Sequence, residues 1–197
     1  MRPAAPAAET RLDAAFFARD VHTVARELVG CRLFHEGCGG TIVETESYGR
    51  DDPACHAHVG LTARTATLFG PPGRAYVYLS YGIHSLLNAV AEPEGQAAAV
   101  LFRALRPTAG PEAMRARRGE RPEAELCSGP GKLTDALGVG LDANDADLGA
   151  DPFLLLPPEP GWRGEVVAGP RVGISKAVDR PWRFCLAGSR FVSRPRP

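Results

Sequence analysis

The possible folds of this chain are limited most by a series of short β-like runs that follow one another closely. Residues 75–79, 85–90 and 98–105 are rich in apolar, aromatic and β-branched side chains, and only five and seven residues separate them. Strands joined by such short connections pair in the antiparallel direction. The runs therefore predict neighbouring strands of one antiparallel sheet.

Helices are expected before and after these runs. Apolar residues from position 16 to position 29 recur at helical spacing, with Asp13 and Asp20 as candidate N-caps and Gly30 as a stop, which predicts one or two short helices. Such a pattern favours an α+β fold, a single mixed domain with a curved, mostly antiparallel sheet and flanking helices. The remaining predicted elements are helices at 110–118 and 130–137 and strands near 153–156, 165–174 and 183–187.

The length of 197 residues suits one compact domain and is too short for two substantial ones. Residues 1–11 are rich in Ala and Pro, so we expect a disordered N-terminal arm and a single domain over 12–197. The chain lacks a run of 18 apolar residues and the apolar core of a signal peptide, so we expect a cytoplasmic protein with no membrane partner. The five cysteines include no CxxC pair and are expected to be reduced thiols.

Residues 31–35 and 41–48 alternate like strands, and the Gly-rich segment 36–40 between them reads as a hairpin connection. Strict alternation would put Glu44, Glu46 and Tyr48 on one face, and Ile42 would share it. Two carboxylates that point the same way can support general acid–base chemistry. Two solvated glutamates on an edge strand are the alternative.

Charge and aromatic residues are distributed unevenly, although the formal net charge is +0. Residues 53–91 contain no Asp or Glu but hold two arginines, three histidines and three of the four tyrosines. Aromatic rings among cations can stack an unpaired base beside a phosphate backbone, or the tyrosines can simply fill a sheet core. Residues 135–165 carry a net charge of −6 and residues 166–197 one of +6, which would suit one basic face turned toward DNA.

Several reaction types lack the residues they need. Only Lys132, in a turn-like Gly-Pro-Gly-Lys segment, and Lys176, near the C-terminal end, could supply an amine nucleophile. Cys55, His56 and His58 cluster without the further ligands of a tetrahedral metal site, and no phosphate-binding loop or dinucleotide fingerprint occurs. We therefore expect no metal and no cofactor.

Six sequence blocks occur in this order along the chain: Val43–Tyr48, Asp52–His56, Phe69–Gly73, Tyr76–Gly82, Leu101–Leu105 and Cys127–Leu133. Read together, they resemble the 3-methyladenine (alkyladenine) DNA glycosylase family, and the resemblance spans roughly residues 14–193. It implies a DNA-inserting β-hairpin and a base-excision-repair enzyme that flips damaged, alkylated or deaminated purines out of double-stranded DNA and hydrolyses the N-glycosidic bond. No lyase step and a monomeric state are expected with it.

The resemblance also assigns roles around the reacting bond. Glu46 matches the residue that activates water, with Arg103 and the backbone carbonyl of Val172 helping to hold that water. Alternation alone cannot choose between Glu46 and Glu44. Arg103 could equally be a structural partner of either glutamate, and such a partner would keep a carboxylate ionised, as a general base requires.

Further matches concern the flipped base. Tyr48 and His56 match residues that sandwich it and Tyr78 one that supports the same pocket, while Cys55 occupies a position where a small Ser or Ala is expected. Asn88 matches a residue that disfavours the exocyclic amine of guanine. Tyr81 matches the side chain that fills the gap that the flipped nucleotide leaves in the duplex.

Two other functions remain open from the residues alone. A nucleoside-scale N-ribosyl hydrolase would share a carboxylate and stacking aromatics but would need no basic surface. A non-enzymatic nucleic-acid-binding module would explain the arginines and tyrosines, but it would gain nothing from Glu46 beside a base pocket.

Overall fold

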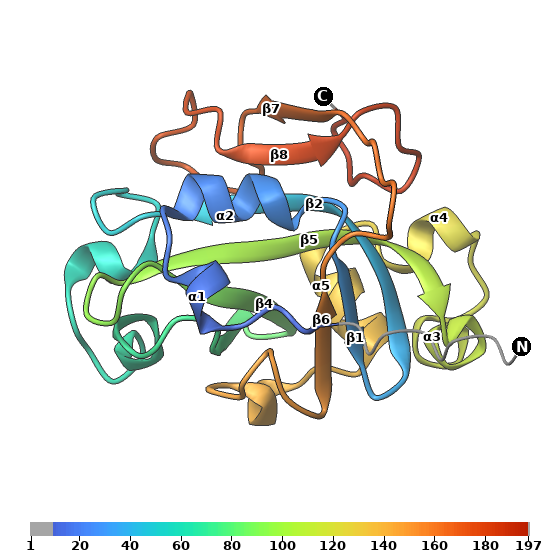
Figure 1. Ribbon diagram of the computed structural model, residues 1–197, viewed down its shortest axis with the longest axis horizontal. Helices are drawn as coiled ribbons and strands as arrows, with labels where there is room; N and C mark the ends of the chain where they lie inside the picture. Colours follow the sequence, from blue (N-terminus) through green and yellow to red (C-terminus); the bar gives the residue numbers. More distant parts are fainter. Residues whose placement is uncertain (1–9, 197) are drawn as a thin grey trace, which may run out of the picture.

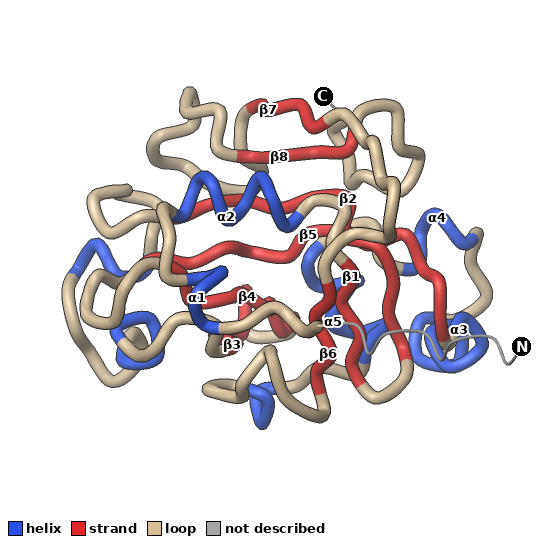
Figure 2. Tube along the Cα trace, viewed as in Figure 1, coloured by secondary structure: helices blue, strands red, loops and turns tan. Residues whose placement is uncertain are grey.

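The computed structural model describes residues 10–196, and its centre is one curled sheet of eight strands (Figures 1 and 2). The strand order is β3-β4-β5-β2-β1-β6, and β8 pairs with both β2 and β7. Every strand pair in these residues is antiparallel, which confirms the predicted curved antiparallel sheet. The strands are β1 (Arg32–His35), β2 (Cys38–Tyr48), β3 (Ala75–Ser80), β4 (His84–Ala91), β5 (Ala98–Ala109), β6 (Phe153–Leu156), β7 (Val166–Gly169) and β8 (Arg183–Leu186).

Short helices flank the sheet, as an α+β fold requires (Figure 2). The side chains of Asp13 and Asp20 accept hydrogen bonds from the Phe16 and Thr23 amides, which confirms both predicted N-caps. One helix, α4, and three 3₁₀ turns were not predicted, because elements of three or four residues are too short to show a period. The helices are α1 (Ala14–Phe17), α2 (Val21–Leu28), α3 (Pro111–Arg118), α4 (Glu123–Leu126) and α5 (Pro130–Leu137), and the 3₁₀ turns are η1 (His56–Val59), η2 (Ala66–Phe69) and η3 (Leu141–Ala143).

The main core lies between the sheet and these helices. Phe17 and Leu28 of α1 and α2 pack in one buried cluster with Phe102 of β5 and Leu133 of α5. A second, smaller cluster fixes the irregular segment between β2 and β3 onto the sheet, since Ala57 and Leu68 pack there against sheet residues. This second cluster matters for function because the segment carries part of the site described below.

The predicted Gly-rich connection at 36–40 is wrong in extent. Only residues 36 and 37 form the turn, and β2 already begins at Cys38. The next two residues of β2 are glycines, because the neighbouring backbone comes too close to leave room for a side chain. A Cβ atom on Gly39 would lie 2.1 Å from the Leu33 carbonyl oxygen, and one on Gly40 would lie 1.9 Å from that of Arg106.

Strict alternation along β2 is also wrong at one point. Opposite Leu105 and Ala104 of β5 stand Ile42 and Glu44, so Val43 is an extra residue on β2, a β-bulge. Ile42 joins the main core, whereas Val43 packs in a separate cluster beside β8. Ile42 and Glu44 therefore have different surroundings, and the bulge resets the pattern before the two glutamates.

The predicted N-terminal arm falls mainly outside the described residues, which begin at Thr10. Arg11 donates to the carbonyls of Gly149 and Phe153 and pairs with Asp151 at 2.8 Å. Whether the domain begins at residue 12 stays a prediction. Within residues 10–196 all five cysteines are buried free thiols, and no helix is long and apolar enough to cross a membrane.

Candidate active site

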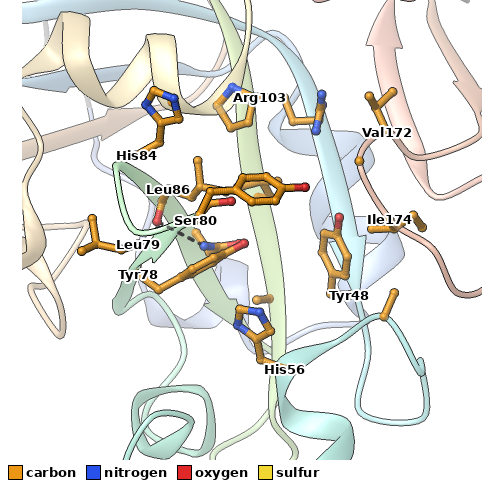
Figure 3. A pocket seen from close by; sticks show the side chains of 18 of the residues that line it. Tyr48, His56, Tyr78, Leu79, Ser80, His84, Leu86, Arg103, Val172 and Ile174 are labelled. Carbon is orange, nitrogen blue, oxygen red and sulfur yellow. Dashed lines mark hydrogen bonds between the residues drawn. The ribbon is translucent and has the colours of Figure 1, made fainter.

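A cleft of about 880 Å³ opens on one side of the sheet. Its walls are the β3–β4 hairpin, the loop at 53–56, the start of α5 and the loop at 172–176, and part of it is shown in Figure 3. No acidic residue lines it in the described part of the chain, as the acid-free stretch 53–91 suggested. Its cationic lining residues are Arg64, Arg103, Arg118, Arg121, Lys132 and Lys176.

Aromatic rings form opposite sides of this cleft. Figure 3 shows Tyr48 on one side and Tyr78 with His56 on the other. The His56 ring meets the Tyr78 ring edge to face at 4.5 Å between centroids, and its Nδ1 lies 2.9 Å from the Tyr76 hydroxyl. Tyr76 is buried and packs in the second cluster, as the alternative of core-filling tyrosines expects, but Tyr76 lines the cleft as well, together with Tyr48 and Tyr78.

His56 is held in its neutral form. Burial and the neighbouring Arg64 guanidinium both lower the pKa of His56. Arg64 Nη2 lies 3.4 Å from His56 Nε2, and a guanidinium can only donate, so Nε2 must be the acceptor and Nδ1 must carry the proton toward Tyr76. The cleft therefore contains a neutral imidazole beside a permanent cation.

Glu46 lies fully buried directly behind the cleft wall. Its Oε1 accepts a hydrogen bond from the Val172 amide at 2.7 Å, and its Oε2 accepts one from the Tyr48 hydroxyl at 2.7 Å. Arg103 Nη1 lies 3.3 Å from the same Oε2. All three contacting residues line the cleft, so the Glu46 carboxylate lies directly behind side chains and backbone of the cleft wall.

The Glu46 carboxyl has an unusual protonation equilibrium. Burial raises its pKa above the ordinary value, and Arg103, the Tyr48 hydroxyl and the Val172 amide oppose this only in part. Arg103 favours the ionised form of Glu46, as expected of an arginine partner, but desolvation is the larger effect on the pKa. A raised pKa brings a carboxylate closer to the range in which it can take a proton from water.

Glu44, two residues earlier, is also fully buried but is surrounded differently. Its Oε1 accepts from Arg103 Nε at 2.6 Å, Arg183 Nε at 2.8 Å and Ser193 Oγ at 2.8 Å, and its Oε2 accepts from the Ser193 amide at 2.7 Å. Burial by itself would raise the pKa of Glu44, but the two guanidinium groups and the Ser193 amide outweigh it and lower the pKa. Both glutamates are buried, so the alternative of two solvated side chains on an edge strand is excluded.

Counting hydrogen-bond donors separates the two carboxylates. An ionised carboxylate offers about four lone-pair sites. Glu44 accepts four hydrogen bonds, three on Oε1 and one on Oε2, from two guanidinium groups and Ser193. Glu46 accepts two, one on each oxygen, and the Arg103 guanidinium forms an ion pair with its Oε2, so at least one lone-pair site of Glu46 has no donor among the described residues. Arg103 contacts both glutamates, so both structural pairings considered from the sequence are present.

Asn88 and Cys55 both line the cleft. The Asn88 side-chain nitrogen donates to the Tyr76 carbonyl at 3.0 Å, so the residue is a buried amide bonded to backbone and also part of the cleft wall. Burial raises the pKa of the Cys55 thiol to about 11, so at neutral pH it adds no charge. Asn88 and Cys55 thus shape the cleft as neutral groups.

Tyr81 lies at the tip of the β3–β4 hairpin and is 90% exposed. Its backbone φ of +51° lies in the left-handed region, which costs energy for a residue other than glycine. Ile83, in the same turn, is 73% exposed. The hairpin thus presents apolar and aromatic surface to solvent beside a basic cleft.

Two features of the site differ from the sequence analysis or were missed by it. Both lysines line the cleft, and Lys132 belongs to helix α5 rather than to a turn. The sequence also did not predict the buried ion pair between Asp52 and Arg171. Their distance of 119 positions in the chain left no local signal that they meet.

No group of three or more His, Cys, Asp or Glu side chains that could hold a metal ion occurs in residues 10–196.

Residues 15–190 match the family model described as "Methylpurine-DNA glycosylase (MPG)". The chain belongs to the methylpurine-DNA glycosylase family. The match covers nearly the whole span over which the sequence resembles such enzymes.

Individual relatives agree with the family. The chain is 58% identical over 182 residues to a protein of Rhodopseudomonas palustris strain HaA2 named as a 3-methyladenine DNA glycosylase, with 91% of this chain and 89% of the relative covered. It is 52% identical over 182 residues to a protein of the same name from Rhizobium meliloti strain 1021, covering 92% and 96%. A third relative with this name, from Nitrobacter winogradskyi, is 51% identical over 193 residues, covering 98% and 92%.

As a member of this family the protein is a monofunctional DNA glycosylase of base excision repair, and its substrate is DNA. The two alternatives drawn from the residues, a hydrolase of free nucleosides and a binding module without activity, are thereby overturned. The presence of both lysines in the cleft does not alter the reaction class.

Proposed function

We propose that the protein excises alkylated or deaminated purines from double-stranded DNA by turning the damaged nucleotide into the cleft. The base would lie between the rings of Tyr48 and His56, with Tyr78 completing the stack. The support is geometric, since these rings face one another across the cleft and His56 is neutral. A neutral imidazole can stack on a cationic alkylated base without charge repulsion.

The duplex would be held open by the hairpin tip. Tyr81 would enter the space that the flipped nucleotide leaves, where insertion of an aromatic side chain offsets part of the unstacking cost of a few kcal/mol. Its 90% exposure and left-handed backbone support this role, because a tyrosine placed there has no packing function in the free protein. The arginines and lysines along the cleft would contact phosphates.

The reaction would use Glu46 as the general base. A water hydrogen-bonded to the remaining lone-pair site of Glu46 would give its proton to the carboxylate while its oxygen bonds to C1′ of the sugar. The C1′–N bond breaks and its electron pair leaves with the base. The observation that carries this proposal is a buried carboxylate that accepts two hydrogen bonds within the described residues and whose three contacting residues all line the cleft.

Three neighbours would assist. Arg103 and the Val172 carbonyl would hold the attacking water, and the negative carboxylate would also stabilise positive charge that develops on the sugar. Asn88, buried in the cleft wall with its nitrogen committed to backbone, would restrict which exocyclic groups a purine can bring there. The reaction needs no metal or cofactor in this scheme.

We further infer that the protein acts as a monomer in the cytoplasm, on chromosomal DNA. One chain supplies the hairpin, the basic lining and the carboxylate, so the proposed site is complete without a second copy. The DNA substrate supports the location.

Incubation of the protein with duplexes that each carry one methylated adenine, hypoxanthine or etheno adduct tests this proposal. We expect alkali-sensitive abasic sites from at least one lesion and no covalent adduct on borohydride treatment. Undamaged duplexes and duplexes with a lesion pyrimidine are the controls. Excision confined to pyrimidines, or cleavage of all bases alike, would contradict the proposed substrate class.

A further inference from the structure

The ion pair between Asp52 and Arg171 lies beside the cleft, and both side chains are completely buried. Arg171 Nη1 and Nη2 contact the two carboxylate oxygens of Asp52, the second at 3.0 Å. Arg171 Nη1 also donates to the Ser47 carbonyl at 3.0 Å. The pair thus joins the end of β2 to the segments at 52–56 and 171–176.

The same pair contacts the aromatic wall of the cleft. The Arg171 guanidinium carbon lies 4.6 Å from the centre of the Tyr48 ring and 5.0 Å from that of Trp182. Asp52 accepts a further hydrogen bond from the Ala54 amide at 3.0 Å, at the start of the loop that carries His56. The rings proposed to hold the base therefore depend on the same two charges.

Stability alone does not account for this arrangement. A buried ion pair rarely repays the desolvation of both charges, and apolar side chains of similar size often stabilise a fold as well or better. Within the described residues Arg171 Nε is a buried donor without a hydrogen-bond partner, which adds to the cost. An element with such costs is better explained by the geometry that it imposes.

That geometry leads directly to Glu46. The peptide bond between Arg171 and Val172 is planar, so holding Arg171 in place restricts where the Val172 N–H group can lie and point. This N–H donates to Glu46 Oε1 at 2.7 Å. We infer that Asp52 and Arg171 are positioning residues for the glycosylase reaction, which hold the Val172 amide on Glu46 and leave its remaining lone-pair site open to water. The inference rests on the proposed role of Glu46 as general base.

Two variants test it because both keep a cation at position 171. Asp52→Asn removes the charged acceptor, and Arg171→Lys keeps a charge but cannot bind both carboxylate oxygens in parallel. Loss of the Val172 hydrogen bond would raise the pKa of Glu46, so the acid side of the single-turnover pH–rate profile should move to higher pH. The plateau rate should fall about tenfold or more. If Asp52 acted on Glu46 only through its charge, removing that charge would lower the pKa of Glu46 and move the acid limb to lower pH. The direction of the shift therefore separates positioning from a charge effect.

The matched control is Leu155→Ala, a cavity variant in β6 at the edge of the sheet opposite the hairpin strands. It should lower the melting temperature and leave both the pH profile and the plateau unchanged. Folded Asp52 and Arg171 variants with a wild-type profile and rate would overturn the inference, and so would failure of both to fold under conditions where Leu155→Ala folds. Absence of an acid limb in the wild-type protein would instead refute the role of Glu46.

Discussion

The surroundings of Glu44 and Glu46 differ although the two residues share a strand, a residue type and complete burial. Around Glu44, β8 and the segment at 190–193 supply a second arginine and a serine, and the carboxylate accepts four hydrogen bonds. Around Glu46, the partners are one arginine, one phenolic hydroxyl and one amide, and all of them line the cleft. The pKa is lowered for Glu44 and raised for Glu46.

This comparison shows how one strand can carry both a structural and a reactive carboxylate. Two guanidinium groups and the Ser193 amide stabilise the ionised form of Glu44. Glu46 has fewer partners, so its charge is less well stabilised and one acceptor site remains. The proposed reactivity of Glu46 thus follows from its having fewer hydrogen-bond and ionic partners than Glu44.

The largest expected effect on stability is that of Glu44→Gln. The substitution leaves the buried Arg183 without its carboxylate partner, and breaking a buried pair in this way costs about 3–5 kcal/mol of unfolding free energy. Glu46→Gln should change the unfolding free energy much less, because its ionised form is already disfavoured by burial. Urea denaturation at neutral pH measures both.

The pH dependence of that difference provides a check. A carboxyl whose folded-state pKa is lowered contributes stability above its unfolded-state pKa and loses it as the pH falls through the folded-state value. The gap between wild type and Glu44→Gln should therefore shrink on acidification. Equal stability of the two Gln variants at neutral pH would contradict the contrast.

Tyr48→Phe is expected to have the next largest effect. It keeps the ring but removes the hydroxyl that donates to Glu46, and a hydrogen bond to a charged group is worth about 1.5–3 kcal/mol. The pKa of Glu46 should rise further, so the acid limb of the pH–rate profile should move about one unit or more to higher pH. Tyr76→Phe, whose lost hydroxyl contacts His56 instead, is the control and should leave that limb in place.

Tyr81→Ala should weaken retention of the flipped nucleotide. Stacking of an aromatic side chain on a base is worth about 1–3 kcal/mol, so the flipped population followed with a fluorescent base analogue should fall about 5- to 150-fold. Leu141→Ala removes another exposed apolar side chain, on η3, and should have no effect. Equal flipping signals from wild type and Tyr81→Ala would refute the proposed insertion.

Arg64→Ala should have the smallest effect. Arg64 is the second cause of the lowered pKa of His56, after burial, so its removal should raise that pKa only part of the way to its ordinary value. Titration of the His56 ring by NMR measures the change. A pKa that stays the same or falls would show that Arg64 does not act on His56.

The sequence analysis was most successful where the chemistry is local. Nearly all helices and strands of four residues or more could be predicted from periodicity and capping residues, and the acid-free stretch indicated the basic cleft. The bulge at Val43 could not be predicted, because it depends on the pairing of β2 with β5 rather than on the residues of β2. Strand alternation could not separate Glu46 from Glu44 either, since Arg183 and Ser193 reach Glu44 from about 140 to 150 positions away.

The most direct test of the account is the single-turnover excision rate of Glu46→Gln and Glu44→Gln on a lesion-bearing duplex, corrected for the folded fraction. Loss of the general base predicts a decrease of about 10²- to 10⁴-fold or more for Glu46→Gln, with lesion binding largely retained. Folded Glu44→Gln should keep most of the wild-type rate. Activity that survives in Glu46→Gln but disappears in folded Glu44→Gln would reverse the assignment, and survival in both would show that neither glutamate activates the water.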